Sequence, residues 1–307
     1  MSNLSTLGAW SFHPLASPFP STILPNIAYW NVTNGTWEYE VQVSWPLNWT
    51  SRDVASTVET LYVLDGNALG LSTTEAFRKR RPVDFAQSDT IVVSVGYPAS
   101  NLQPDSPYSD ARYYDYQMPV CPTCAPQQDA PGVPSGGAAF LAFLDGVLRP
   151  WVHEYFPQTH FNRDGLYGHS FSGLFVLYAL FTRPDLFDVW MSASPYLVWN
   201  GEFFFSRDSP LYSGVHRNAT TKPALQISYG ELEQNAKKRR METQEMFEAR
   251  RAFLASMKME DLCTRLYDEV KGSGLLRDVE LHEYPFSYHA AVGGNALADG
   301  IDYFLDW

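Results

Sequence analysis

Apolar and polar residues follow a two-residue period in some parts of the chain and a helical period in others. Residues 37–46 (WEYEVQVSWP) alternate apolar and polar side chains, which predicts a half-buried strand. Residues 60–66 (TLYVLDG) and 90–98 (TIVVSVGYP) are rich in branched side chains and end in turn formers. Such runs are typical of strands that are buried on both faces of a parallel sheet.

Segments with helical spacing lie between and after these runs. Residues 72–81 (STTEAFRKRR) predict a helix that is opened by a Ser/Thr cap. Further helices are predicted at 138–156, 173–181, 237–270 and 296–307, and further strands at 189–195, 225–231 and 278–286. Strands that alternate with helices indicate an α/β fold, with a mainly parallel central sheet covered by helices on both faces.

We expect one domain over residues 1–307, with residues 1–40 as an N-terminal extension. Residues 98–137 interrupt the pattern, because they contain eight prolines and almost no periodicity. They would enter at the carboxyl end of a strand, where open α/β sheets bind ligands. The segment is therefore predicted to be a lid-like insertion, and the alternative is a passive surface loop.

The composition narrows the class of partner. The chain has 34 acidic and 22 basic residues, a formal net charge of −12, which argues against nucleic acid and anionic membranes and favours a neutral or cationic small molecule. The start of the chain lacks a basic segment and an unbroken apolar core, and the chain has three cysteines. We therefore expect a cytosolic protein, in which the sequons at Asn31, Asn34, Asn48 and Asn218 arise by chance.

The first candidate for chemistry is the stretch 164–175, DGLYGHSFSGLF. It resembles the G-x-S-x-G turn that presents a nucleophilic serine between a strand and a helix, except that Ser172 stands where the second glycine belongs. Gly168 keeps the first small position, and serine is the next smallest choice for the second. We predict that Ser170 is a nucleophile, and the alternative is a plain strand-to-helix turn.

A serine nucleophile needs a histidine as its base and an acid that orients this histidine, in the chain order serine, acid, histidine. Of the histidines after Ser170, His216 precedes the strand that should deliver the acid, and His282 lies within a strand pattern. His289 follows the last predicted strand, so it is the expected base. Glu233 in GELEQN is the favoured acid, with Glu231, or no acid at all, as alternatives.

The tetrahedral intermediate of acyl transfer needs two backbone N–H donors. The residue after the nucleophile, Phe171, supplies the first one. The turn that follows 62–65 supplies the second, with Asn67 best placed and Gly66 next, although a common tight turn would have the same sequence.

Two other motifs favour structural explanations. Cys121 and Cys124 (CPTC) lack a second pair of ligands for zinc and do not open a helix as a redox pair does, so we expect two reduced thiols or a local disulfide. Residues 237–240 (KKRR) are predicted to begin a helix of mixed charge with a solvated face. No cofactor and no metal site are expected.

From about Val41 to its end, the chain resembles the esterase D-like branch of the α/β hydrolases, which includes ferric-siderophore esterases. The motifs that carry the resemblance are YVLDGNA, ARYYDY, the elbow with its flanks from 165 to 200, YGELEQN and the histidine of YHAAV. The resemblance implies an α/β-hydrolase fold and a serine esterase, with Ser170 as nucleophile, His289 as base and the amides of Phe171 and Asn67 as oxyanion donors. Some members use a serine–histidine dyad. Because the start of the chain does not resemble a signal peptide, the chain is most similar to the fungal members of this branch, which hydrolyse fusarinine-type hydroxamate siderophores.

The predicted activity is therefore hydrolysis of a small-molecule oligo-ester through an acyl-enzyme, with a ferric hydroxamate siderophore as the expected substrate. One alternative is an acyltransferase or a macrocyclising, thioesterase-like enzyme of secondary metabolism, in which an alcohol or amine replaces water. A generic carboxylesterase is another. A third hypothesis is a binding protein that has kept the fold and lost catalysis through the change at Ser172.

Overall fold

The computed structural model describes residues 6–16, 23–120, 134–212 and 222–307. A ten-stranded sheet runs through the molecule in the order β1-β2-β3-β4-β6-β5-β7-β8-β9-β10. Strands β6, β5, β7, β8, β9 and β10 pair in parallel, whereas β1 to β4 join the β6 edge in antiparallel pairs. The strands are β1 Thr6–Leu7, β2 Trp10–Ala16, β3 Ile27–Thr33, β4 Glu38–Ser44, β5 Thr57–Leu64, β6 Asp89–Gly96, β7 His160–His169, β8 Val189–Ala193, β9 Ala224–Gly230 and β10 Asp278–Tyr284.

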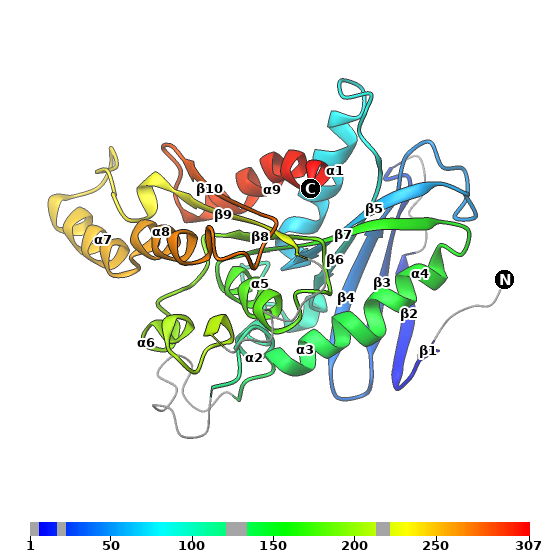
Figure 1. Cartoon of the computed structure of the whole chain (residues 1–307), viewed down its shortest axis with the longest axis horizontal. Helices are drawn as coiled ribbons and strands as arrows, with labels where there is room; N and C mark the ends of the chain where they lie inside the picture. The colour runs from blue at the N-terminus through cyan, green and yellow to red at the C-terminus, as the bar shows by residue number, and fades with distance from the viewer. Residues whose placement is uncertain (1–5, 17–22, 121–133, 213–221) are drawn as a thin grey trace.

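Helices cover both faces of this sheet, as Figure 1 shows, with α1 and α9 on one face and α3, α4, α5 and α8 on the other. The α-helices are α1 Gly66–Arg80, α2 Arg112–Asp115, α3 Gly137–Phe143, α4 Arg149–Tyr155, α5 Phe171–Thr182, α6 Trp199–Glu202, α7 Gln244–Ser256, α8 Met259–Val270 and α9 His289–Asp306. Short helical turns are η1 Ala99–Asn101, η2 Leu144–Leu148, η3 Phe203–Phe205, η4 Pro210–Tyr212 and η6 Glu231–Glu233. The α/β-hydrolase architecture that the resemblance implies is present.

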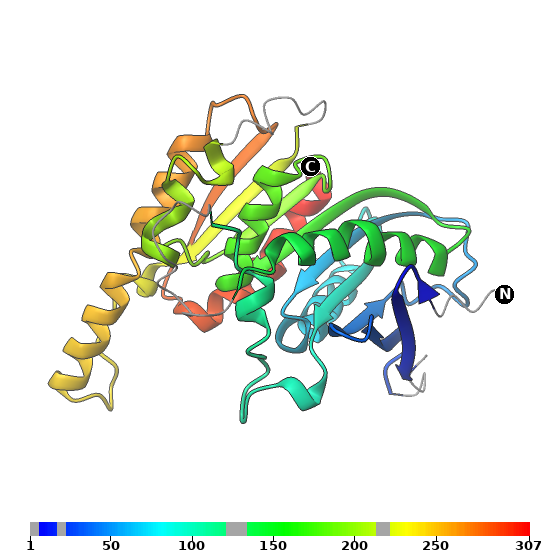
Figure 2. The same ribbon diagram turned by 90° about the horizontal axis from the view of Figure 1, so that it is seen from below.

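Each face of the sheet has its own apolar core. The side chains between the sheet and α1 and α9 form one cluster, with Phe304 and Ile301 fully buried. The larger cluster lies under α3, α4, α5 and α8 and is rich in aromatic rings, including Trp151 and Trp190. In the view from below, α5 and the continuous α3–α4 segment cross this second face (Figure 2). No helix in the described residues is long and apolar enough to span a bilayer.

Helix α5 shows why these residues form a buried element. All but its last residue are buried, so a helix that is apolar on every side fits between the strands β7 and β8 and the outer helices. Its neighbour β7 is buried from Asp164 onward, and together they carry the stretch 164–175 into the centre of the molecule.

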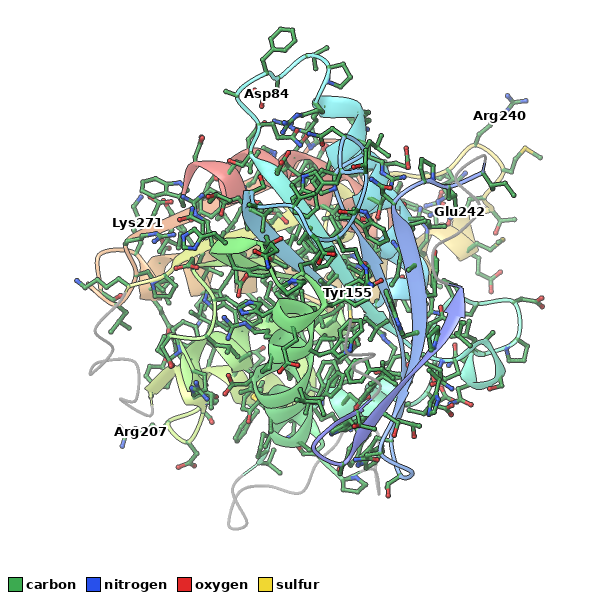
Figure 3. The ribbon with its side chains drawn as sticks, turned by 90° about the vertical axis from the view of Figure 1, so that its right-hand side faces the viewer. Asp84, Tyr155, Arg207, Arg240, Glu242 and Lys271 are labelled. Atoms are coloured by element: carbon green, nitrogen blue, oxygen red, sulfur yellow. The ribbon has the colours of Figure 1, made fainter. Side chains whose placement is uncertain are left out.

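Several sequence-based helix boundaries were wrong. The closing helix predicted at 296–307 begins at His289, and the segment predicted as one helix over 237–270 forms the two helices α7 and α8. The helix predicted at 72–81 begins six residues earlier, at Gly66, and its N-cap is Asp65 rather than a Ser/Thr residue. Residues 237–240 precede α7 as an extended loop instead of starting a helix, and Arg240 projects away from the body of the molecule (Figure 3).

Parts of the predicted N-terminal extension (1–40) and of the predicted insertion (98–137) lie within the residues that the structure describes. Within residues 1–40, strands β2 and β3 pair with each other and extend the sheet beyond β4. Within 98–137, the described residues include η1 and the short helix α2, whose Arg112 and Asp115 contact the body of the domain. Cys121 and Cys124 lie outside the described residues.

Candidate active site

Ser170 lies at the apex of a sharp turn between β7 and α5. Its backbone has φ 62° and ψ −116°, a conformation that residues with side chains rarely adopt. Backbone hydrogen bonds fix the turn, from Ser170 N to Ala193 O at 2.9 Å and from Tyr196 N to Ser170 O at 3.1 Å. A Cβ on Gly168 would lie 2.4 Å from the carbonyl oxygen of Ser172, so the first small position of the motif is required.

Three side chains from distant parts of the chain form a hydrogen-bonded line at this turn. Ser170 Oγ lies 2.9 Å from Nε2 of His289, and Nδ1 of His289 bonds Oε1 of Glu233. His289 is the first residue of α9, and Glu233 ends the turn η6 that follows β9. The histidine side chain is 43% exposed and the glutamate 2%, so the imidazole is open to a ligand and the carboxylate is not.

The carboxylate of Glu233 is fixed by donors on both oxygens. Oε2 accepts from Ser194 Oγ and from the backbone N–H of Gly230, both at 2.7 Å, while Oε1 faces His289. Because a buried charge is costly unless its lone pairs are satisfied, these bonds make the glutamate a stable acceptor for an imidazolium. The structure thus brings Glu233 together with Ser170 and His289.

Glu231 lies elsewhere, although it is only two residues away. Its Oε1 bonds Lys237 at 2.8 Å, and its Oε2 accepts from the N–H of Phe286 at 2.8 Å. The Lys237 contact and the Phe286 hydrogen bond both lower the pKa of Glu231. Its hydrogen bonds therefore hold the loop before His289 rather than the histidine ring.

His169 also lies beside the site, although it was not among the residues predicted from the sequence. Its ring centroid lies 4.5 Å from that of His289, and its side chain is buried. Burial and, secondarily, the nearby His289 lower the pKa of His169 to about 3, so the ring is neutral near pH 7. A neutral ring at this position adds no positive charge beside the His289 ring. Its place directly before Ser170 was the available signal.

The other candidate histidines do not join this line. His282 lies on β10 with its ring 4.4 Å from that of Tyr284, in agreement with its prediction as a strand residue. His216 lies outside the described residues.

The two predicted oxyanion donors lie in the first turns of two helices that follow adjacent strands. Phe171 is the first residue of α5, after β7, and Asn67 is the second residue of α1, after β5. Within the described residues neither backbone N–H has a hydrogen-bond partner, as is usual at a helix N-terminus. The Asn67 side chain fixes its own position, because Oδ1 accepts from Tyr97 N at 2.7 Å and Nδ2 donates to Tyr97 O at 2.9 Å.

A cavity of about 220 Å³ lies beside Asn67, between α1 and strands β3, β4 and β6. Leu102 and Pro107, from the predicted lid region, complete its wall, together with Glu40 of β4. Burial raises the pKa of the Glu40 carboxyl. Asn67, a predicted oxyanion donor, is in the wall of this cavity, whereas Ser170, His289 and Glu233 are not.

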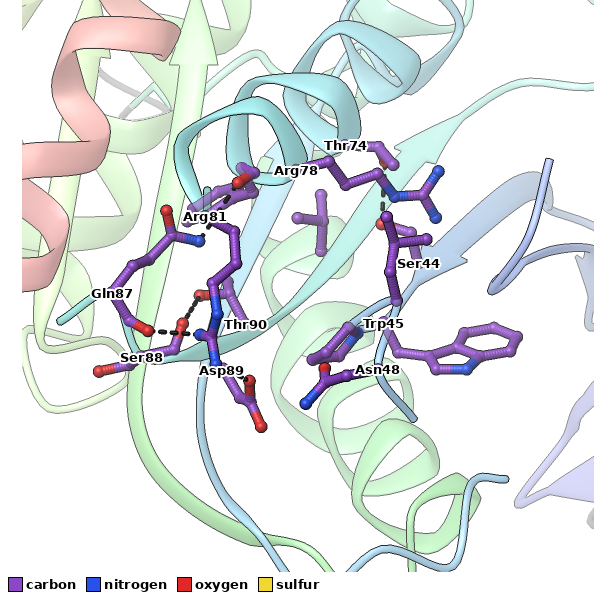
Figure 4. A pocket seen from close by; sticks show the side chains of 14 residues that line it. Ser44, Trp45, Asn48, Thr74, Arg78, Arg81, Gln87, Ser88, Asp89 and Thr90 are labelled. Carbon is purple, nitrogen blue, oxygen red and sulfur yellow. Dashed lines mark hydrogen bonds and ion pairs between the residues drawn. The ribbon is translucent and has the colours of Figure 1, made fainter. Parts of the chain in front are cut away.

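A second cavity, of about 250 Å³, lies at the opposite edge of the sheet (Figure 4). Ser44 at the end of β4 and Asp89 at the start of β6 line it, and Arg81 pairs with Asp89 at 3.1 Å. None of the three residues of the hydrogen-bonded line is in its wall. It is therefore separate from the site at Ser170.

Comparison with known proteins adds an independent finding. Residues 33–264 match the family model described as "Putative esterase". The chain is 36% identical to the siderophore enterobactin esterase of Emericella nidulans, over 95% of this chain and 96% of that one. It is 32% identical to the siderophore triacetylfusarinine C esterase of Aspergillus fumigatus, over 92% and 95%. The solved structure of the siderophore hydrolase EstA from Aspergillus nidulans superimposes with a TM-score of 0.84 at 34% identity, over 95% of this chain and 98% of that one.

Proposed function

The chain belongs to this esterase family and is a carboxylic ester hydrolase, and we propose that it cleaves the ester bonds of a siderophore with Ser170, His289 and Glu233 as its catalytic triad. The observation that carries the assignment of residues is the continuous line from Ser170 Oγ through His289 to Glu233. The names of the two relatives support a siderophore as the substrate.

The geometry accounts for the acylation step. Ser170 Oγ attacks the ester carbonyl carbon and passes its proton to Nε2 of His289, while Glu233 stabilises the imidazolium through Nδ1. The carbonyl oxygen becomes an oxyanion that the N–H groups of Phe171 and Asn67 stabilise. Collapse of the intermediate breaks the C–O bond, and His289 gives its proton to the departing alcohol.

Deacylation uses the same groups. Water gives a proton to His289 as its oxygen attacks the acyl carbon, and the second tetrahedral intermediate expels Ser170 Oγ, which takes the proton back. The products are a carboxylic acid and a free serine, so the cycle needs no cofactor. The open side of His289 leaves room for the water.

Exposed aromatic rings beside the site suit a bulky substrate. Tyr113 is 42% exposed with its ring 5.7 Å from that of Phe171, and Phe286, three residues before His289, is 74% exposed. Lys237 lies 4.6 Å from the centroid of the Phe286 ring. Such a rim can pack against a large ligand, and a ferric hydroxamate siderophore remains the substrate that we propose.

We further propose that the enzyme acts in the cytosol. The chain has only three cysteines, and Cys263 is a buried free thiol. A small number of cysteines, one of them a buried free thiol, fits a reducing compartment.

The test compares ferric and iron-free forms of triacetylfusarinine C and enterobactin with a simple chromogenic ester, using wild type and Ser170→Ala. We expect the wild type to prefer a siderophore ester and Ser170→Ala to lose turnover of every ester. Equal turnover by both proteins would end the assignment of Ser170. Turnover of the chromogenic ester alone would leave a generic carboxylesterase.

A further inference from the structure

Ser172 occupies the glycine position of the elbow, and its hydroxyl group is fully engaged. The side chain has 0% exposure, and its Oγ lies 2.8 Å from Oδ2 of Asp65 and accepts from the backbone N–H of His169 at 2.9 Å. The carbonyl oxygen of His169, at 2.9 Å, is a weaker second acceptor than a carboxylate. The hydroxyl therefore connects the elbow to the end of β5, a separation of 107 residues along the chain.

Asp65 is the residue at which β5 turns into α1. It has φ 54° and ψ 47°, a left-handed conformation that favours glycine and asparagine, and it is the N-cap of α1. Its backbone N–H donates to the hydroxyl of Tyr116 at 3.2 Å. Because Asn67 is the second residue of α1, the conformation of Asp65 decides where the Asn67 N–H points.

Arg112 completes the contacts of this carboxylate. Its Nε donates to Oδ1 of Asp65 at 3.0 Å and its Nη2 to Oδ2 at 2.8 Å, in a two-pronged pair with side-chain exposures of only 12% and 3%. Burial alone would lower the pKa of Arg112, but the Asp65 carboxylate raises it above its ordinary value. Asp65 is thus held by Arg112 on α2 and by Ser172 on α5.

We propose that Ser172, through Asp65, is a positioning residue that sets the relative placement of the two oxyanion amides. Ser172 is the second residue of the helix that carries the Phe171 N–H, and Asp65 caps the helix that carries the Asn67 N–H. The hydrogen bond between Ser172 and Asp65 therefore links the first turn of α5 to the N-cap of α1. Arg112 keeps the carboxylate in the orientation that this bond needs. The inference rests on the proposed function, because it assigns a role within the same reaction.

The test replaces the hydroxyl alone. Ser172→Ala and Ser172→Gly both keep the residue small, as the elbow needs, and remove the hydrogen bond to Asp65. Because a misplacement of about 1 Å can cost roughly 100-fold in rate, we expect kcat to fall about 10- to 100-fold with little change in KM. Binding of a boronic acid that forms a tetrahedral adduct with Ser170 should weaken by a similar factor.

Ser192→Ala is the matched control. Ser192 Oγ is buried and donates to the carbonyl oxygen of Gly173 at 2.9 Å, so this variant loses a buried serine hydrogen bond near the elbow that does not reach Asp65. We expect its melting temperature to fall about as much as that of Ser172→Ala while its kcat stays near wild type. Arg112→Lys should also lower kcat, because lysine cannot form the two-pronged pair, but by less than Ser172→Ala, because the hydrogen bond from Ser172 to Asp65 remains.

The outcomes separate this inference from the proposed function. If the wild type hydrolyses esters, Ser170→Ala does not, and Ser172→Gly keeps the wild-type kcat, then Ser172 is only a tolerated change and the positioning role is overturned. Equal losses of kcat in Ser172→Ala and Ser192→Ala would also overturn it. If an active-site phosphonate fails to label Ser170 in the folded wild type, the proposed function itself fails.

Discussion

At the scale of single residues, the direction in which a side chain points decides whether it reaches the site, more than its position in the sequence does. Glu231 and Glu233 both follow β9, but they belong to a 3₁₀ turn, in which residues two apart point to different sides. Only Glu233 reaches His289, and only its carboxylate is buried among donors. The sequence favoured this residue because it lies further along the loop, but no pattern in GELEQN predicts the turn that orients the two side chains.

Glu233→Gln tests this orientation. The amide keeps the size of the side chain but cannot stabilise an imidazolium as a carboxylate does, so we expect kcat to fall by roughly 10³- to 10⁴-fold. Glu231→Gln is the control, and it should stay within about threefold of wild type, because the glutamine oxygen can still accept from the Phe286 N–H and keep the loop before His289 in place. Initial rates on one chromogenic ester measure both variants. Similar losses in the two would contradict the assignment of Glu233.

Other residues at the site show what a sequence reveals and what it does not. The proximity of Ser170 and His289 was predictable, because a buried strand, a small residue two positions earlier and an apolar helix identify the elbow, and the proposed base must follow the last strand. The role of Ser172 was not predictable, because its partner Asp65 is distant in the chain. The same holds for His169, whose burial depends on the close approach of α9.

At the scale of elements, the site is built from the ends of helices. The start of α1 was missed because Gly66 and Asn67 are poor helix formers and the local pattern indicates a turn. Packing overrides that preference, since a Cβ at Gly66 would lie 2.9 Å from the backbone carbon of Val95 and only glycine lets α1 begin so close to β6. The starts of α5 and α9 carry Ser170 and His289 in the same way.

A substitution at the contact between the end of β9 and the loop before α9 tests whether this contact positions His289. A Cβ on Gly230 would lie 2.4 Å from the carbonyl oxygen of Ser287, so Gly230→Ala should push the histidine loop away from the strand that delivers Glu233. We expect a loss of stability of about 1–3 kcal/mol, as for other overpacked sites, and a larger fractional loss of kcat. Thermal melting and initial rates measure the two effects.

Gly294→Ala is the control for that change. Gly294 lies in α9, and a Cβ there would meet nothing within 4 Å. Alanine should therefore stabilise the helix by up to about 1 kcal/mol and leave the rate unchanged. Wild-type activity in Gly230→Ala would show that the β9 edge does not position the base.

At the scale of the whole molecule, the sheet brings distant segments to one edge and buries ionisable groups on the way. The alternation of strands and helices made the parallel part of this sheet predictable, whereas the pairing of β2 with β3 and of β3 with β4 depends on tertiary contacts that residues 1–40 do not reveal. Asp115 is one of the buried groups. Burial raises its pKa to about 7, although hydrogen bonds from Tyr97 and Tyr39 partly oppose this.

Asp115 and His169 give the free energy of unfolding opposite dependences on pH. Between about pH 4 and pH 7 the folded protein holds a proton on Asp115 that the unfolded chain releases, so this contribution stabilises at low pH and is lost as the pH rises. Between about pH 3 and pH 6.5 the unfolded chain protonates His169 and the folded protein does not, so that contribution is lost as the pH falls. Both amount to a few kcal/mol, and they largely cancel in the wild type.

Removing one of these two groups should therefore make the pH dependence contributed by the other one measurable. Asp115→Asn should make the free energy of unfolding rise more steeply with pH between 4 and 6.5 than in the wild type, because only the His169 contribution remains. His169→Gln should shift the slope in the opposite direction over the same range. Urea unfolding at several pH values, compared with wild type so that all shared carboxylates drop out, measures both slopes. Parallel curves for the two variants and the wild type would mean that neither group is held in its unusual protonation state by the fold.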